Sequence, residues 1–461
     1  MGSSSDAETL HADNFATKLE IGKIISHLLG EVFNAPMPNR NPIKIGSDSL
    51  AEFLTWCTNK GITWDGVEVD EDPTVGFQLI ATRDLGENEV LVKVPRKAII
   101  SHDQVVRSAA LRKLYSRDHL LSQMDNVALA FGICALQLKG DSGWSPYLDI
   151  LPATFHTPLC FSLQEFEELR PSPTFEDALS HFKAVARQFC YFLSVIEQND
   201  AFDALRKSER QRKEPPPLYG GPFTVGNFTF GLYRWAVCAV STRINFIPSE
   251  FEKTGDVPKK VPCLIPLLDF ANHSYSDNWK HFPGYTDDLE FAVLPSNEPV
   301  RAGEPVTIQY GIRTSADFFL YNAFCPKLNP YHKYKLRIGL SKTDKFLEER
   351  MRLIAELGYG GRSPVYIFDL FHADERGGMP FDEALISFVC IFIANPPDES
   401  VGCLESQAKA VSFIATRVSL LLRGYERKEE GTGAVADLHR HDKAILQEVL
   451  AYCSTWKPKT N

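Results

Sequence analysis

The sequence predicts an α+β fold in which two strand-rich regions flank a helical insert, and a helical region follows them. Residues 67–95 contain short segments with the two-residue alternation of strands, and strand character returns in residues 261–310. Between them, residues 103–198 have the three- and four-residue apolar spacing of helices, and this spacing also dominates after residue 344. We therefore expect a β-rich domain interrupted by helices, with an all-α C-terminal domain after it.

The composition limits the function classes that fit the chain. Its 461 residues, 44% of them hydrophobic, are enough for two or three domains of roughly 150 residues. The net charge of −10 argues against nucleic acid as the main partner, because phosphate binding needs a basic face. There is no run of ~18 apolar residues and no signal-peptide pattern at the N-terminus. We expect a cytoplasmic protein, with the nucleus as a second location, that contacts neither nucleic acid nor membrane and acts as a monomer.

The ten cysteines indicate neither a disulfide framework nor a metal site. They are scattered and include no CxxC pair, and most lie in apolar patterns typical of small buried thiols, as do Cys134, Cys190, Cys238 and Cys390. The twelve histidines are dispersed, and the cluster at residues 439–442 is interpreted as a solvated helix start. We expect a reducing compartment and no bound metal.

The first part of the chain predicts two helices followed by strands. Residues 15–33 and 49–60 have helical spacing, with a Pro/Asn-rich linker at 35–43 between them and Gly61 ending the second helix. Three strands, expected to form a small β-meander, follow at residues 67–69, 76–80 and 90–95.

The later segments are mainly helical. Residues 228–244 predict a strong helix that ends before Pro248, and the basic run at 206–213 is interpreted as a solvated loop rather than a recognition patch. Residues 333–340 predict one strand, and residues 427–436 a charged loop. Helices are expected at 344–357, 381–394, 405–422 and 437–456.

Two stretches carry the functional signal. The first, CLIPLLDFANH at residues 263–273, runs apolar, breaks at Asp269 and closes on an Asn-His pair. The second, PVTIQYGIRTSADFFLYNAF at residues 305–324, is a strand ending in Tyr-Gly followed by a helical pattern. There is no GxSxG or HExxH motif and no glycine-rich loop after a strand, so hydrolase, metalloenzyme and nucleotide-binding functions have no support.

In this order the two stretches resemble the SET-domain protein methyltransferases. The resemblance is to the branch with a helical insert and a helical C-terminal domain, typified by the Rubisco large-subunit lysine methyltransferases. Within that branch, five stretches are similar to the actin-histidine methyltransferases: residues 75–83, 116–131, 144–158, 233–248 and 310–318. The resemblance spans about residues 45–450 and implies the knotted, β-rich SET fold.

The resemblance also implies a division of the chain. Residues 1–45 would form a polar segment with a helix, and residues 46–102 and 226–325 the two parts of the SET domain. The helical insert would lie at 103–225, and a helical substrate-binding domain at 326–461.

The implied activity is methyl transfer from S-adenosyl-L-methionine to a protein side chain, with histidine as the acceptor and actin as the first candidate substrate. A histidine side chain has a reference pKa of ~6.5 and is largely neutral in the cytosol, whereas lysine, at ~10.4, must first lose a proton. Tyr310 matches the catalytic tyrosine of the family, and Asn245 matches the residue that accepts the ring N–H of the target histidine. Each residue also has a purely structural interpretation. Tyr310 could be a core tyrosine at a strand end, and Asn245 could cap the end of the helix before Pro248.

The family motifs assign the remaining site residues by position. Arg243 would pair with the cofactor carboxylate, and Arg313 would meet the substrate chain. The other cofactor contacts would be Val75, Gly76, Phe77, Asp269, Phe270, Ala271, Asn272, His273, Asn322, Ala323 and Phe324. The apolar substrate contacts would be Ile247, Ile265 and Leu268.

The sequence departs from the family pattern at three places. Val75 stands where the family has a glutamate over the adenine, and the expected N-terminal arginine has no match except Lys44 or Arg40. Leu268 replaces the tryptophan of the histidine-specific pocket, although Trp279 could fill the space. Three functions therefore stay open: a histidine methyltransferase, a lysine methyltransferase of the same branch, and a SET-fold binding protein without catalysis.

Overall fold

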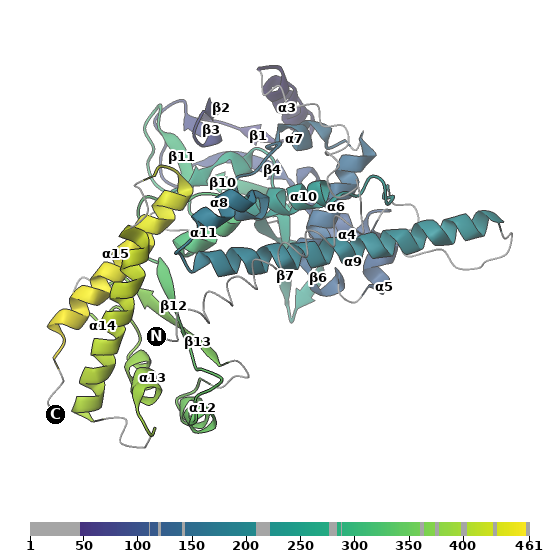
Figure 1. Ribbon diagram of the computed structural model, residues 1–461. Coiled ribbons are helices and arrows are strands. Elements are labelled where there is room, and N and C mark those ends of the chain that lie inside the picture. Colours follow the sequence, from purple (N-terminus) through teal and green to yellow (C-terminus); the bar gives the residue numbers. More distant parts are fainter. Residues whose placement is uncertain are drawn as a thin grey trace. The chain divides into compact units, whose positions relative to one another are not determined.

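The computed structural model describes residues 47–109, 111–118, 121–140, 143–208, 222–275, 284–286, 288–359, 364–373, 378–397, 403–426 and 431–457. The helix expected at 15–33, the linker at 35–43, most of the basic run, Arg40, Lys44 and Trp279 lie outside these residues. The chain divides into two compact units (Figure 1). Unit 1 comprises residues up to 160 and residues 179–311, and unit 2 comprises residues 161–178 and residues from 312 onward.

Unit 1 begins with the elements expected from local patterns. Helix α3 (Ser47–Asn59) ends before Gly61, whose φ of +79° is readily adopted only by glycine. Strands β1 (Thr63–Trp64), β2 (Val67–Asp72), β3 (Gly76–Ala81) and β4 (Val90–Pro95) follow.

The strands of unit 1 form three sheets, and their pairing corrects the predicted meander. The orders are β1-β4-β10-β9, β2-β3-β11-β8 and β5-β7-β6. Strand β4 does not pair with β3, because the second edge of β3 is occupied by β11, with Val306 opposite Leu79. The additional strands are β5 (Ile100–Ser101), β6 (Asn245–Thr254), β7 (Val257–Leu264), β8 (Asn272–His273), β9 (Gly284–Tyr285), β10 (Phe291–Pro295) and β11 (Pro305–Ile308).

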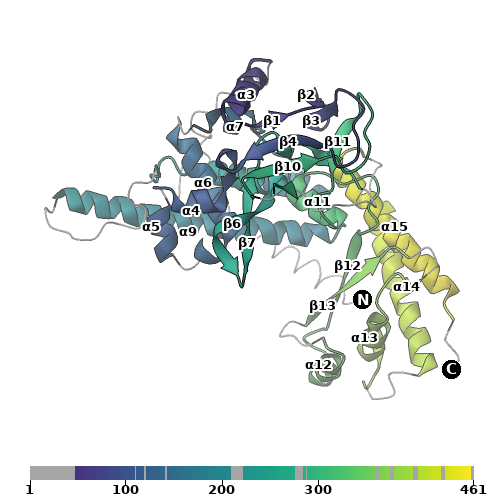
Figure 2. The ribbon, with the colours of Figure 1, turned by 180° about the vertical axis from the view of Figure 1, so that it is seen from behind.

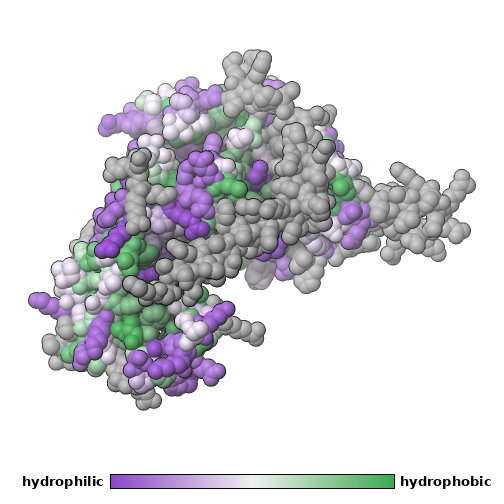
Figure 3. All heavy atoms as spheres, in the orientation of Figure 1, coloured by the Kyte–Doolittle hydropathy of each residue, from purple (hydrophilic) through white to green (hydrophobic). Residues whose placement is uncertain are grey.

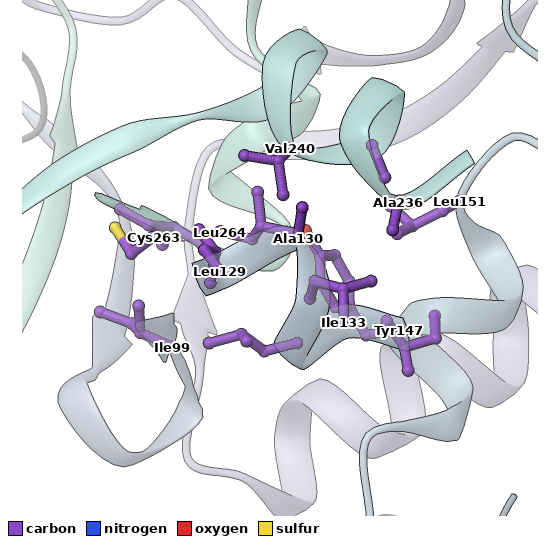
Figure 4. Packing of buried hydrophobic residues seen from close by; sticks show 14 of the residues in the cluster. Ile99, Leu129, Ala130, Ile133, Tyr147, Leu151, Ala236, Val240, Cys263 and Leu264 are labelled. Carbon is purple, nitrogen blue, oxygen red and sulfur yellow. The ribbon is translucent and has the colours of Figure 1, made fainter. Parts of the chain in front are cut away.

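The helices of unit 1 supply much of its core. They are α4 (His102–Arg107), α5 (Arg112–Arg117), α6 (Asp125–Lys139), α7 (Ser145–Ile150) and α10 (Phe230–Arg243), together with most of α9 (Thr174–Ser208). Helix α6 packs against α10 and β7, and Figure 4 shows Ile133 of α6 and Val240 of α10 in this core. Each such aliphatic side chain, once buried, stabilises the fold by about 1.5–3 kcal/mol. The core holds α10 against β7, whose last two residues begin the CLIPLLDFANH stretch.

Helices α4 and α6 approach each other closely at Gly132. A Cβ placed on Gly132 would lie 2.1 Å from Cγ1 of Val105, far inside van der Waals contact. Glycine at this position therefore permits the packing of α4 on α6.

Unit 2 is mainly helical, as expected, and it also contains a two-stranded sheet. Helices α14 and α15 pack together, and α15 contacts β12 (Lys333–Gly339) and β13 (Val365–Phe371), as Figure 2 shows from behind. Strand β13 was not predicted because two of its three outward side chains, Val365 and Ile367, are apolar, so the alternation of apolar and polar residues is weak. The helices are α8 (Leu163–Glu168), α11 (Ser315–Asn322), α12 (Leu347–Glu356), α13 (Ala384–Ile393), α14 (Leu404–Glu426) and α15 (Ala434–Thr455).

The cysteine predictions are confirmed at three of the four positions. Cys134, Cys238 and Cys390 are buried, whereas Cys190 is exposed. The helical phase of α9 explains the difference, since its neighbour Phe189 faces the core and Cys190 is rotated away from it.

The surface is mixed in character. On the face drawn in Figure 3, hydrophobic and hydrophilic residues are interspersed over the described part of the surface. None of the helices within the described residues is both long and apolar enough to cross a lipid bilayer.

Candidate functional site

The polar end of the CLIPLLDFANH stretch is shaped by a tight turn. Strand β7 ends at Leu264, and the backbone then reverses through Leu267, which has the left-handed φ of +67°. A short 3-10 helix at Leu268–Phe270 leads into β8. The turn brings Asn272 and His273 to the edge of the sheet that contains β11.

Strands β8 and β11 pair in parallel and bring the two predicted motifs together. Asn272 lies opposite Thr307, and His273 lies opposite Ile308. Just beyond β11, the backbone N–H of Tyr310 donates to His273 Nδ1 at 3.2 Å, and the Tyr310 hydroxyl donates to the Ala271 carbonyl at 3.2 Å. The side chain of Tyr310 is half-buried, so the residue is neither a fully enclosed core tyrosine nor a surface one.

A buried carboxyl group lies just before this pair. Asp269 is enclosed by protein, accepts a hydrogen bond from the Tyr147 hydroxyl, and lies 3.9 Å from Nε of Arg243. Burial raises the pKa of Asp269 to about 6, against the opposing effects of Arg243 and Tyr147. Sequence reasoning missed Tyr147 as a site residue, although it lies within the WSPYLDILP stretch that carries part of the resemblance.

Arg243 retains hydrogen-bonding capacity at the end of α10. Its Nη1 donates to Thr242 Oγ1 at 3.0 Å, and its side chain is largely buried. Its Nε has no hydrogen-bond partner among the described residues, and neither does Oδ1 of Asp269. A buried guanidinium with an unused donor is suited to binding a carboxylate.

Two stacked aromatic rings and a glycine with free space around it lie beside Asn272. Phe77 stacks on Phe270 with centroids 5.2 Å apart, and the Asn272 amide donates to the Phe77 carbonyl at 3.5 Å. Gly76 has a φ of +76°, and a Cβ built on it would meet no atom within 4 Å. Val75 beside it is 54% exposed. The start of β3 therefore lies beside β8, with an exposed glycine and stacked aromatic rings close to Asn272.

Asn245 lies two residues from Arg243 and is the first residue of β6. Its side-chain Nδ2 donates to the Arg243 carbonyl at 3.2 Å, so it does bond to the end of α10, as a capping residue would. This bond also fixes the amide orientation and leaves Oδ1 as an acceptor. Near it, Ile247, Ile265 and Leu268 are buried in the core of unit 1.

The other predicted site residues belong to unit 2. Arg313 donates from Nη1 to Asn322 Oδ1 at 2.9 Å, and α11 begins at a capping box between Thr314 and Asp317. Ala323 ends α11 with a φ of +70°. The ring of Phe324 packs against that of Phe318, with ring centroids 5.3 Å apart. Among the described residues, His, Cys, Asp and Glu side chains form no group of three or more that could hold a metal ion.

Comparison with known families and proteins places this geometry in context. The family described as SET domain matches residues 76–311. The actin-histidine N-methyltransferase of Xenopus tropicalis is 30% identical over 441 residues, covering 88% of this chain and 70% of the relative. The proteins of the same name from Gallus gallus and Homo sapiens are 29% and 28% identical, and the chain spans 64% of the length of each.

Solved structures share the fold at lower sequence identity. The SET domain of LSMT bound to lysine and AdoHcy aligns with a TM-score of 0.63 at 18% identity, covering 88% of this chain and 91% of that one. Rubisco LSMT bound to AdoMet aligns with a TM-score of 0.61 at 19% identity, and the alignment covers 89% of this chain and 92% of that one.

Proposed function

The chain belongs to the SET-domain family, and from this premise we propose that it is an S-adenosylmethionine-dependent protein-histidine N-methyltransferase that modifies actin. The observation that carries the proposal is the junction at which Asn272, His273 and Tyr310 meet across β8 and β11. The substrate is proposed from the relatives, which are named for histidine methylation of actin.

The residues at the junction fit the proposed cofactor. When bound, S-adenosylmethionine supplies a methyl group on a positively charged sulfur. Arg243 would hold its carboxylate through the donor that the described residues leave unused. Asn272 and the backbone at Gly76 and Phe77 would hold the remainder, because Gly76 allows close approach and the Asn272 amide has an acceptor oxygen for an amino group.

The acceptor side needs a neutral nitrogen held in one tautomer. In a neutral imidazole one nitrogen carries the hydrogen and the other has the lone pair that attacks. Asn245 would accept the N–H of the target ring through Oδ1, so that the opposite nitrogen faces the methyl group. The Tyr310 hydroxyl, fixed by the Ala271 carbonyl, would orient the reacting groups.

The proposal is tested with the purified full chain, S-adenosylmethionine and unmethylated actin, followed by peptide mapping by mass spectrometry. Methylation of one actin histidine is the expected result, and a Tyr310→Phe variant serves as the matched negative control. If the cofactor binds by calorimetry and every actin histidine stays unmodified, the histidine proposal is wrong. If no cofactor binds at all, the chain is a SET-fold binding protein instead.

Leu268 favours lysine methylation as the second candidate function. A leucine leaves the acceptor pocket without the flat wall that the family tryptophan would provide, and Leu268 is fully buried. Two peptides that differ only in His or Lys at the target position distinguish the candidates. Faster turnover of the lysine peptide, with a shift towards histidine in Leu268→Trp, would support the lysine function.

The proposed substrate also implies a location. If actin is the substrate, the chain must work where actin is found, and we propose the cytoplasm, with the nucleus as a second location. Fractionation of cells that express a tagged chain tests this, and a chain recovered only in a membrane or organelle fraction would contradict it.

A further inference from the structure

Two cysteines from distant parts of unit 1 lie side by side. Cys160 ends the 3-10 helix at Pro158–Cys160, and Cys238 lies on α10, against which this short helix packs. Their sulfur atoms are 3.7 Å apart, and both cysteines are free thiols. Cys238 is buried, whereas Cys160 is partly exposed, so Cys160 is the member of the pair that solvent reaches.

The surroundings favour a thiolate at Cys160. The sulfurs of Cys160 and Cys238 share a hydrogen bond, and with the charge of Arg234 this contact lowers the pKa of Cys160 to about 7, although burial opposes the shift. The same contact raises the pKa of Cys238 well above its usual value, so Cys238 keeps its proton. Thr157 Oγ1 lies 3.3 Å from the sulfur of Cys238 and holds it in place. A partly exposed thiolate beside a protonated thiol is the arrangement of a reactive and a resolving cysteine.

We propose that Cys160 and Cys238 form an oxidation site that takes hydrogen peroxide or a related hydroperoxide and closes to a reversible disulfide. The Cys160 thiolate attacks one peroxide oxygen and becomes a sulfenic acid, and hydroxide leaves. That hydroxide takes the proton of the Cys238 thiol and becomes water. The Cys238 thiolate then attacks the Cys160 sulfur, the S–O bond of the sulfenic acid breaks as the S–S bond forms, and the departing hydroxide takes up a proton from solvent. In total, two thiols lose two electrons and two protons, and one peroxide is reduced to two molecules of water.

Closure would disturb the end of α10. The sulfur atoms must approach from 3.7 Å to the ~2.05 Å of a disulfide, which displaces Cys238 or the segment that carries Cys160. The carbonyl of Cys238 accepts a hydrogen bond from Thr242 Oγ1 at 2.8 Å, and that hydroxyl accepts one from Arg243. Oxidation is therefore coupled to the last turn of the helix, whatever reaction the chain catalyses.

The experiment treats the reduced full-length chain with a small excess of hydrogen peroxide and then blocks the remaining thiols. Non-reducing peptide mapping should find the Cys160 peptide joined to the Cys238 peptide, and dithiothreitol should separate them. Cys160→Ser and Cys238→Ser should each abolish the linkage, and Cys403→Ser, which removes a more exposed thiol, should not. In Cys238→Ser, dimedone should label Cys160 as a trapped sulfenic acid.

Two results would overturn the proposal, and both can be obtained with the unmutated chain. Recovery of Cys160 and Cys238 as free thiols after Cys403 has been oxidised would show that the pair is not reactive. Oxidation of Cys160 to the sulfinic acid without a linked peptide would show that Cys238 does not resolve it. Amide hydrogen exchange at residues 239–247 should become faster in the oxidised chain. Unchanged exchange rates would show that oxidation of the cysteine pair is not coupled to the end of α10.

Discussion

The backbone N–H of Tyr310 is hydrogen-bonded to Nδ1 of His273 at 3.2 Å, which joins Tyr310, two residues beyond the end of β11, to the last residue of β8. The two rings are also in contact, with centroids 5.3 Å apart. Because Nδ1 accepts this bond, a neutral His273 carries its hydrogen on Nε2. The imidazole thus holds the tyrosine backbone in place, and the tyrosine fixes the histidine tautomer.

Replacing Tyr310 with phenylalanine should reduce methyl transfer and preserve cofactor binding. The change removes the hydroxyl that donates to the Ala271 carbonyl and keeps the ring against His273. We expect the turnover rate to fall by about 100-fold or more, as when a positioned donor is lost from a catalytic site. Calorimetry for S-adenosylmethionine provides the control, and a variant with full turnover would exclude a catalytic role for the hydroxyl.

Replacing His273 with alanine should destabilise unit 1, since it removes the acceptor of the Tyr310 N–H. The expected loss in the free energy of unfolding is about 0.5–1.5 kcal/mol for the hydrogen bond, measured by urea unfolding. His273→Asn, which can place an oxygen near the same position, should recover part of the loss. Equal stability of all three proteins would show that this bond contributes nothing.

The Asp269→Asn variant should alter how stability depends on pH. The folded-state pKa of about 6 lies above the ordinary value of 3.8, so the folded protein binds the proton more tightly than the unfolded chain. The resulting stabilisation is complete below about pH 4 and is lost as the pH rises through about 6. Relative to Asp269→Asn, the wild type should lose about 3 kcal/mol over this range, as 1.36 kcal/mol per pKa unit implies. Urea unfolding of both proteins from about pH 4 to above pH 6 measures this difference in the free energy of unfolding. The same dependence on pH in both proteins would contradict the prediction.

Replacing Arg243 with lysine should weaken cofactor binding more than it weakens the fold. The lysine keeps a positive charge near the buried Asp269 and loses the planar fork that binds a carboxylate. We expect S-adenosylmethionine affinity to fall by about 10-fold or more, corresponding to about 1.4 kcal/mol. Thermal unfolding without cofactor controls for folding. An unchanged affinity would assign Arg243 to a purely structural role.

Replacing Gly132 with alanine should destabilise unit 1, although alanine normally favours a helix. The new Cβ would overlap Cγ1 of Val105, and overpacking of this kind costs about 1–3 kcal/mol. Gly86→Ala is the matched control, because the nearest atom to its Cβ would be 4.0 Å away. Urea unfolding should separate the two variants, and equal midpoints would mean that α4 and α6 can move apart without cost.

Local patterns in the sequence predict single elements well and pairings between distant strands poorly. The helix at 228–244 and the strand at 333–340 lie within two residues of α10 and β12 at each end. The position of β4 could not be predicted, because its partner β10 lies about two hundred residues further along the chain. Strand β13 was missed because its outer face carries Val365 and Ile367 beside Asp369, which weakens the alternation of apolar and polar residues.

The candidate site was partly predictable, and the residue order explains why. The two motifs that contain Asn272 and Tyr310 were recognised from their order in the chain, and β8 and β11 bring these motifs together, since Tyr310 bonds to Ala271 and His273 on either side of Asn272. The contact between Tyr147 and Asp269 has no local signal, since 122 residues separate the two side chains. The 3.7 Å approach of Cys160 and Cys238 is equally invisible in the sequence, where each thiol resembles an ordinary apolar residue.

The position of β11 between β3 and β8 has a consequence for how the protein is made. Strand β3 ends at residue 81 and β11 begins at residue 305, so a ribosome must add more than two hundred residues before the two can pair. At about 5–20 residues per second this takes on the order of ten seconds or more. During that time the edge of β3 lacks its native partner β11. The contact between β8 and β11 that brings Asn272, His273 and Tyr310 together cannot form either. A nascent chain can therefore complete this sheet, and the functions that depend on it, only late in its synthesis.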